Sequence, residues 1–199
     1  MVQQMTLPPK PQMVLPVSVI LHPWQVEWAA YAGSQRTERN TGKVKNRPDY
    51  DAKPEALQTD IEANIASCLC ELATSLYTNQ KWNGAYWSPK HHAAATSLPD
   101  VGKNIEVRRT RHLNFGVPVF EQEADDKIQL VQAYITPIDL KDVLNWANKT
   151  PDDFEYVTVL LTGTVAADVA WENSWRPKKW KEKRVCPQAF FQSVKTLRR

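Results

Sequence analysis

The sequence predicts an α/β domain in which helices flank a mixed β-sheet. Three observations predict this class. A long apolar stripe with helical spacing lies in the first half of the chain, and several short segments with a two-residue alternation follow it. The third observation is the length, because 199 residues suit one domain with extensions and are too few for two domains of full size.

The N-terminal segment is expected to be an extended arm. Residues 1–20 contain four prolines and show no helical period, so we assign the single domain to 21–199. A short helix is expected to begin at Pro23, which suits a first helical position, and to stop at Gly33. The polar and charged stretch over 34–53 is then expected to be a loop.

The most regular pattern predicts a helix from Pro54 to Thr78. Apolar side chains recur along it at intervals of three or four residues, so they form one stripe that can face a core. The members of this stripe are Leu57, Ile61, Ile65, Cys68, Leu69, Leu72 and Leu76. Asn83-Gly84 follows as a turn signal and ends the helical region.

After this helix the period changes to two, which is typical of strands. We expect strands at 105–108, 116–120 and 128–135, with turn residues between them, and we interpret the three as a β-meander of consecutive neighbours. The remaining expected elements are a helical insertion near 138–152, a strand at 154–164 and a closing strand or short helix at 186–197.

The composition excludes several classes of protein. The chain has only six glycines and no GxGxxG, GxxxxGK[ST] or GxSxG motif, so dinucleotide-binding, P-loop and serine-hydrolase functions have no support. No stretch approaches the roughly 18 apolar residues of a membrane span, and the N-terminus lacks the pattern of a secretion signal. Three cysteines, an odd number, fit a reducing compartment better than a disulfide framework. We therefore expect a cytoplasmic protein without membrane contact.

The segment with the most chemical information is PDVGKNIEVR at Pro99–Arg108. Residues two apart on a strand share a face, so Glu106 and Arg108 are expected to project together, close to Asp100 at the entry to the strand. Two carboxylates at a sheet edge can hold Mg²⁺ or Mn²⁺, and a neighbouring cation can stabilise negative charge on a phosphate. This set is the minimum for metal-assisted phosphodiester hydrolysis. The alternative is a cross-strand salt bridge on an exposed strand.

The net charge of +3 is distributed unevenly along the chain. Trp171–Arg199 contains nine Lys or Arg and two Glu, a net of +7, so residues 1–170 carry about −4. A basic end on an acidic body indicates an anionic partner, of which nucleic acid is the best match. Indoles between these basic residues can stack on unpaired bases or pack beneath the cationic stems. The candidate nucleic-acid-binding residues are Arg109, Arg111, Trp175, Arg176, Lys178, Lys179, Trp180, Lys181, Lys183 and Arg184. In the alternative, the tryptophans close the core and the charges only solvate the surface.

Two motifs, PDVG at Pro99–Gly102 and EVRRT at Glu106–Thr110, carry a family resemblance. The other matching parts are Pro23–Arg36, Glu71-Leu72-Ala73 with Trp82, Asp125-Asp126 and Val185–Gln188. Together they resemble the PD-(D/E)XK nuclease superfamily, and more narrowly a group of uncharacterised phage-encoded proteins within it. The likeness spans roughly residues 20–197. It implies a restriction-endonuclease-like core, in which a helix with an acidic residue precedes the strands that carry the PD and (D/E)XK elements.

The resemblance implies roles for the matching positions. Asp100 and Glu106 would be metal ligands, and Glu71 would join them from the helix and orient metal-bound water. Arg108 stands where active members of the superfamily usually carry lysine. Arginine keeps the positive charge and can clamp a phosphate, but it cannot accept a proton, so this departure puts the activity in doubt. Glu62 is a second helix candidate on the opposite flank of the apolar stripe.

These observations lead to one functional hypothesis and two alternatives. The hypothesis is a phage nuclease that hydrolyses DNA phosphodiesters with Mg²⁺ or Mn²⁺ in the cytoplasm of the host cell. In the first alternative the protein is catalytically degenerate and binds DNA or a host protein. In the second it is a structural component of a phage assembly. Each of the three is compatible with a homo-oligomer.

Overall fold

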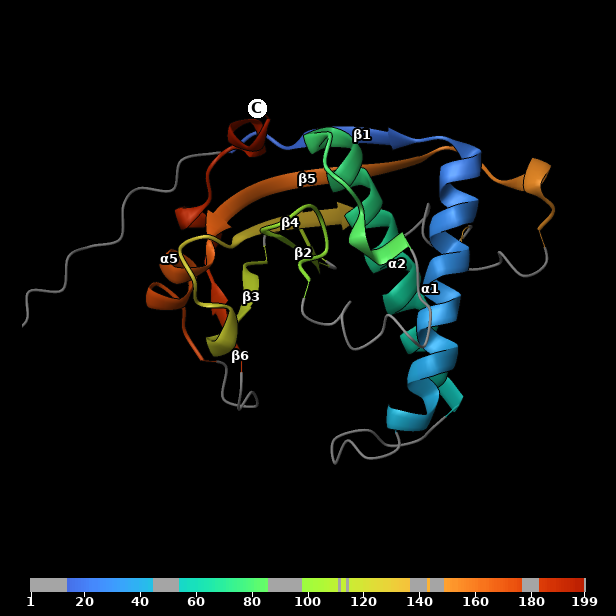
Figure 1. Ribbon diagram of the computed structural model, residues 1–199, viewed down its shortest axis with the longest axis horizontal. Coiled ribbons are helices and arrows are strands. Elements are labelled where there is room, and N and C mark those ends of the chain that lie inside the picture. The colour runs from blue at the N-terminus through green and yellow to red at the C-terminus, as the bar shows by residue number, and fades with distance from the viewer. Residues whose placement is uncertain are drawn as a thin grey trace, which may run out of the picture.

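The computed structural model describes residues 14–44, 54–85, 98–110, 112–113, 115–136, 143, 149–176 and 183–198. Within these residues, two long helices lie beside a four-stranded sheet, and a two-stranded sheet with a short helix lies further from them (Figure 1). This arrangement confirms an α/β class with a mixed sheet and flanking helices. No helix in the described ranges is both long and apolar enough to cross a membrane.

The four-stranded sheet has the strand order β1-β5-β4-β2. Its members are β1 (Val17–Leu21), β2 (Ile105–Thr110), β4 (Gln129–Ile135) and β5 (Val157–Ala166). Strand β2 pairs in parallel with β4, whereas the pairs β4–β5 and β1–β5 are antiparallel. Because β2 has a neighbour in this sheet on one side only, it is an edge strand with backbone groups that face away from the sheet.

Helix α2 (Pro54–Thr78) packs against one face of this sheet, and helix α1 (Pro23–Val44) packs against α2 (Figure 1). Leu69 of α2 lies in the same buried cluster as Val107 of β2 and Val131 of β4. The bounds of α2 equal those that the apolar stripe predicts, and its middle part from Ile61 to Leu72 faces this cluster, whereas Leu76 is 43% exposed.

The second, smaller sheet covers part of the opposite face, around Leu130 and Val165, whereas Ile20 of β1 on that face is 60% exposed. Strands β3 (Val117–Phe120) and β6 (Lys183–Cys186) pair antiparallel, and helix α5 (Ala167–Glu172) packs beside them. Leu130 of β4 lies in a second buried cluster with Val117. The remaining elements are single turns of 3₁₀ helix at Asn83–Ala85, Glu121–Glu123, Pro151–Asp153, Gln188–Phe190 and Val194–Leu197.

The extended arm expected over 1–20 is wrong in its last residues. Val17–Leu21 forms β1 and pairs antiparallel with β5 as an edge of the main sheet. The alternation of half-buried and exposed side chains along β1 is typical of an edge strand, and the preceding prolines hide this short signal. Residues 1–13 lie outside the described part of the chain.

The helix expected to stop at Gly33 continues through that residue. Helix α1 runs to Val44 and replaces the first part of the loop expected over 34–53. Gly33 lies where α1 meets α2, and a Cβ added there would lie 2.5 Å from the Cα of Ile65. This glycine therefore allows two helices to approach closely and is not a helix stop.

The three strands expected at 105–108, 116–120 and 128–135 are confirmed as strands, but the meander is wrong. The first and third pair directly and in parallel, while the middle one leaves the sheet to pair with β6. Strand β5 confirms the strand expected at 154–164. The closing segment forms the end of β6 and two 3₁₀ turns. Most of the insertion expected near 138–152 lies outside the described residues.

Candidate functional site at the edge strand

The edge strand β2 presents Glu106 and Arg108 on one face. Both side chains point away from α2, because Ile105 and Val107 fill the helix-facing cluster. Asp100 lies in a tight turn just before the strand. Its side chain lies against the strand, and its Oδ2 accepts a hydrogen bond of 2.8 Å from the backbone N–H of Val107. Asp100 thereby caps a donor on the open edge of the sheet and comes to lie beside Glu106 and Arg108.

Asn83 holds the turn that carries Asp100. Its side-chain amide donates to the carbonyl oxygens of Pro99 at 2.7 Å and Gly102 at 2.6 Å, and its backbone N–H donates to that of Asp100 at 3.0 Å. Gly102 adopts a φ of 61°, in the left-handed region that favours glycine. The PDVG motif is therefore a turn whose geometry is fixed from both sides.

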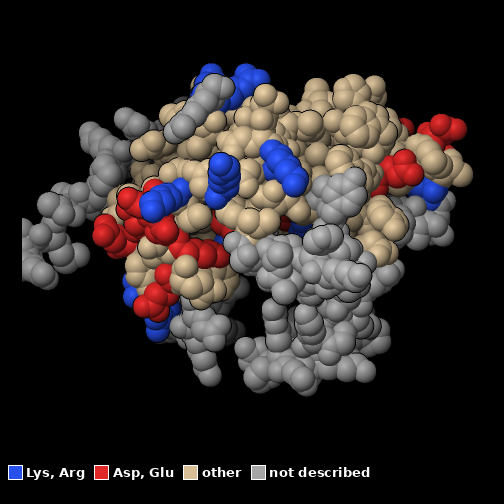
Figure 2. Space-filling model, viewed as in Figure 1, with Lys and Arg blue, Asp and Glu red and all other residues tan. Residues whose placement is uncertain are grey.

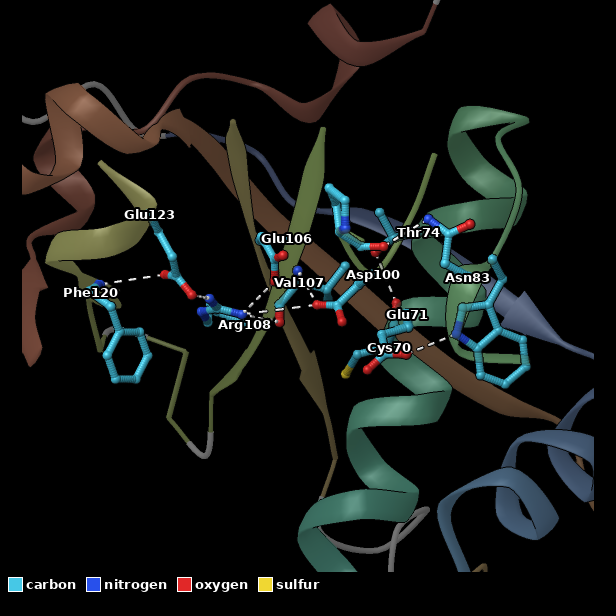
Figure 3. Close-up of polar contacts among 12 residues, drawn as sticks. Cys70, Glu71, Thr74, Asn83, Asp100, Glu106, Val107, Arg108, Phe120 and Glu123 are labelled. Carbon is cyan, nitrogen blue, oxygen red and sulfur yellow. Dashed lines mark hydrogen bonds and ion pairs between the residues drawn. The ribbon is translucent and has the colours of Figure 1, made fainter. Parts of the chain in front are cut away.

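Arg108 occupies the centre of a cluster of carboxylates. Its Nη1 lies 3.1 Å from Oε2 of Glu106 and 3.9 Å from Oδ2 of Asp100, and its Nη2 lies 2.5 Å from Oε1 of Glu123. Figure 3 shows Arg108 between Glu123 on one side and Asp100 on the other. The guanidinium carbon also lies 5.9 Å from the centre of the Phe120 ring.

Burial changes the proton affinity of this cluster. It raises the pKa of Asp100, and the charges of Glu71 and Glu106 raise it further, while the Val107 N–H and Arg108 act in the opposite direction. Burial also raises the pKa of Glu106 against the opposing effect of Arg108. The pKa of Arg108 would be lowered by burial, but the carboxylates of Glu123, Glu106 and Asp100 outweigh this and raise it. The site thus favours an added proton or cation next to Asp100 and Glu106.

Glu71 lies close by but is engaged elsewhere. Its two carboxylate oxygens accept hydrogen bonds from Arg36 at 2.6 and 2.5 Å, and Oε2 accepts another from the indole N–H of Trp82 at 2.8 Å. Its side chain is 4% exposed, against 26% for Asp100 and 21% for Glu106. Glu71 therefore acts on Asp100 through its charge, and its own oxygens are turned to Arg36 and Trp82.

A pocket of about 660 Å³ opens over the cluster. Asp100, Glu106, Arg108 and Glu123 line it, and Arg36 forms part of its wall. The described part of the chain contains no group of three or more His, Cys, Asp or Glu side chains arranged to hold a metal ion. A cation in this pocket would have two protein carboxylates, which is the number that Mg²⁺ uses when water and substrate phosphate supply its other ligands.

The other predicted nucleic-acid contacts are only partly described. Arg109 lines the pocket and forms an ion pair of 3.2 Å with Glu62, the second helix candidate. Trp175 is 54% exposed and Arg176 is exposed. The guanidinium of Arg184, in contrast, lies 4.1 Å from the centre of the Trp171 ring, so this indole packs against a cationic side chain. Arg111, Lys178, Lys179, Trp180 and Lys181 lie outside the described residues, and Lys183 is described only as a backbone position of β6.

Three residues of the site were not among the site residues that the sequence predicts. Glu123 binds Arg108 from the turn after β3, Asn83 fixes the PDVG turn, and Arg36 binds Glu71 from the part of α1 expected to be a loop. Each one reaches the site through a long-range contact, so no spacing rule can find it.

Comparisons with known proteins add no relative. No family model, no curated protein and no solved structure matches this chain.

Proposed function

We propose that the pocket at Asp100, Glu106 and Arg108 binds and hydrolyses nucleic-acid phosphodiesters, with DNA as the substrate and Mg²⁺ or Mn²⁺ as the cofactor. The observation that carries this proposal is the charge of the site. Arg36 and Glu71 neutralise each other, and Arg108 faces three carboxylates. Arg109 is likewise paired with Glu62, so when all three carboxylates are ionised the partly buried pocket carries two negative charges, which a divalent cation would balance.

The residues present fit such a cation in part. Asp100 and Glu106 would hold it, since both are partly exposed to the pocket and burial favours a positive charge beside them. When bound, it supplies a Lewis acid for a phosphate oxygen. Glu71 does not fit as a ligand because Arg36 and Trp82 occupy its oxygens, so we assign it to the positioning of Arg36 at the pocket wall.

Arg108 is suited to the binding of phosphate. It keeps its positive charge at every physiological pH and can donate two parallel hydrogen bonds to phosphate oxygens. It cannot take a proton from an attacking water, so that proton would have to pass to a carboxylate or to solvent. Glu123 is the carboxylate of the pocket that is not assigned to the cation, and it lies 2.5 Å from Nη2 of Arg108, so it is placed to accept one.

Membership of the PD-(D/E)XK superfamily is part of the same proposal. It is supported by a helix with an acidic residue, α2, that packs on a mixed sheet whose edge strand carries Glu106 and Arg108 after Asp100. A restriction-endonuclease-like core and a phage origin are both proposed from the resemblance in sequence. If the superfamily membership is wrong, neither has other support.

One observation favours a second candidate, a nucleic-acid-binding protein without catalysis. Arg108 is bound to both Glu106 and Glu123, so the pocket already contains a counterion for its carboxylates. A protein that had lost its metal would gain stability from such an arrangement, because an arginine in place of lysine can contact two carboxylates at once.

A cleavage assay separates the two candidates. Wild-type protein is incubated with plasmid and with labelled single- and double-stranded DNA and RNA, in Mg²⁺, in Mn²⁺ and in EDTA. We expect metal-dependent cleavage of DNA that Glu106→Ala abolishes without a loss of folding. Glu121→Ala is the matched control, since Glu121 is an exposed carboxylate on the turn that also carries Glu123.

Arg108→Lys tests the departure from the superfamily directly. A rise in cleavage would mean that arginine limits a competent site, and a fall would mean that its two-point contact with phosphate is required. Absence of cleavage by both proteins on every substrate with either metal would overturn the proposal and leave the non-catalytic candidate.

A further inference from the structure

A second pocket, of about 1280 Å³, lies where strands β2 and β4 begin. It is bounded by the C-terminal end of α2, by the Gly102–Asn104 turn, by the segment before β4 and by the last 3₁₀ turn of the chain. Asn83 lines this pocket and also the pocket over Asp100, so the two adjoin. We call the second pocket the lysine groove.

The lysine groove is basic, in contrast to the acidic pocket beside it. Three lysines line it, Lys81, Lys103 and Lys127, and the only carboxylate among its described lining residues is Asp126, which leaves a charge of +2. None of the three lysines makes a salt bridge within the described part of the chain. Figure 2 shows basic side chains in a row across this face of the molecule, with acidic side chains at one end of the row.

Hydrogen bonds hold the three lysines at fixed spacing. The N–H of Gly102 donates to the carbonyl oxygen of Lys81 at 2.8 Å, and the side-chain amide of Asn104 donates to that of Lys127 at 3.0 Å. Lys103 lies between these two cross-links in the sequence. The backbone positions that carry the three lysines are therefore linked through two hydrogen bonds, and the exposed lysine side chains extend from them.

We propose that the lysine groove binds the phosphate backbone of duplex DNA and leads it to the pocket at Asp100 and Glu106. This inference rests on the proposed function for the identity of the adjoining site. The groove lies next to that site through Asn83, and it has the opposite charge to DNA.

The other lining residues favour a backbone contact over a contact with bases. Apart from Gly102, Ile105 and Leu197, they carry hydrogen-bonding side chains, among them Asn79, Gln80, Asn104, Gln129, Gln192 and Thr196. Such groups commonly bind phosphate and sugar oxygens. No aromatic side chain is found among the described lining residues, so the groove offers no platform on which unpaired bases could stack.

The test is the salt dependence of DNA binding in EDTA, where cleavage cannot occur. Fluorescence anisotropy with a short labelled duplex is measured from about 50 to about 200 mM NaCl for the wild type and the triple variant K81Q/K103Q/K127Q. We expect the slope of log K against log salt to fall by about 3, roughly 0.9 for each phosphate contact, and binding to weaken by about tenfold or more. The triple arginine variant should restore both quantities.

A control variant and the cleavage assay give each result one meaning. Lys149→Gln removes a lysine that contacts Asp153 and Phe154 away from the groove, and it should leave the slope unchanged. A wild type whose duplex binding depends on the three lysines but which never cleaves DNA in Mg²⁺ or Mn²⁺ would contradict only the proposed hydrolysis. An unchanged slope in the folded triple variant would overturn the groove proposal, as would a wild type that binds no duplex or prefers single strands.

Discussion

Glu71→Gln is the substitution that best separates a structural role from a catalytic one. Glutamine keeps one oxygen for Arg36 or Trp82, but it removes the charge that balances a buried guanidinium and turns an amide N–H₂ toward the donors of Arg36. Removing one partner from a buried ion pair destabilises a protein by about 3–5 kcal/mol. For a chain of this size each kcal/mol lowers Tm by roughly 2–4 °C, so we expect a fall of about 6–20 °C.

Urea unfolding, followed by tryptophan fluorescence, measures the free energy of unfolding of this variant. The matched control is Glu62→Gln on the same helix, whose pair with Arg109 is more exposed, with the Glu62 side chain 28% exposed against 4% for Glu71. We expect the control to lose about 1 kcal/mol or less. The double variant Arg36→Met/Glu71→Met removes both charges and should recover much of the stability lost by Glu71→Gln.

A loss below about 1 kcal/mol in Glu71→Gln would refute the ion-pair argument. If such a stable variant also lost DNA cleavage, Glu71 would act on the substrate or its metal, as the resemblance in sequence implies. If such a stable variant kept DNA cleavage, Glu71 would have neither the structural role in the ion pair with Arg36 nor a catalytic role.

Two further predictions concern packing and protonation. Gly33→Ala should destabilise the protein by about 1–3 kcal/mol in urea unfolding. The added Cβ would lie 2.5 Å from the backbone of Ile65, so α1 and α2 would have to separate. An unchanged free energy of unfolding would mean that the two helices can separate without cost. Asp100→Asn should raise Tm relative to the wild type in EDTA, and this difference should grow as the pH rises from about 4 to about 8. The pKa of Asp100 is raised in the folded state, so its contribution to stability is fully present below the ordinary value of about 4 and is lost as the carboxyl ionises at higher pH. A difference in Tm that does not vary with pH would contradict this sign.

The sequence predicts those parts of the fold that depend on local periodicity. The stripe of α2 repeats over many turns, so its bounds follow from spacing alone. Strands β2, β3 and β4 alternate clearly and are also found, but their partners depend on contacts between distant segments. Strand β3 pairs with β6, more than 60 residues later, and no local pattern encodes that choice.

The same division applies to the candidate site. Asp100, Glu106 and Arg108 are predicted together because two of them share a strand face and the third enters the same strand. Glu123 joins them only because β3 leaves the main sheet and its following turn returns over β2. Arg36 could not be assigned because Gly33 looked like the end of a helix, whereas packing against α2 carries the helix past it.

Arg108 and Glu123 belong to one arrangement. A lysine ammonium is a single point charge, whereas the guanidinium places Nη1 on Glu106 and Nη2 on Glu123 at the same time. A phosphate that enters the pocket therefore meets a guanidinium already bound on both sides, and it can bind Arg108 only by exchanging with one of these carboxylates. The carboxylate released in that exchange is left without its counterion in a partly buried site, where a divalent cation or a proton compensates it most directly. Under the proposed function, anion binding and cation binding at this pocket would therefore be linked through Arg108, and each would strengthen the other.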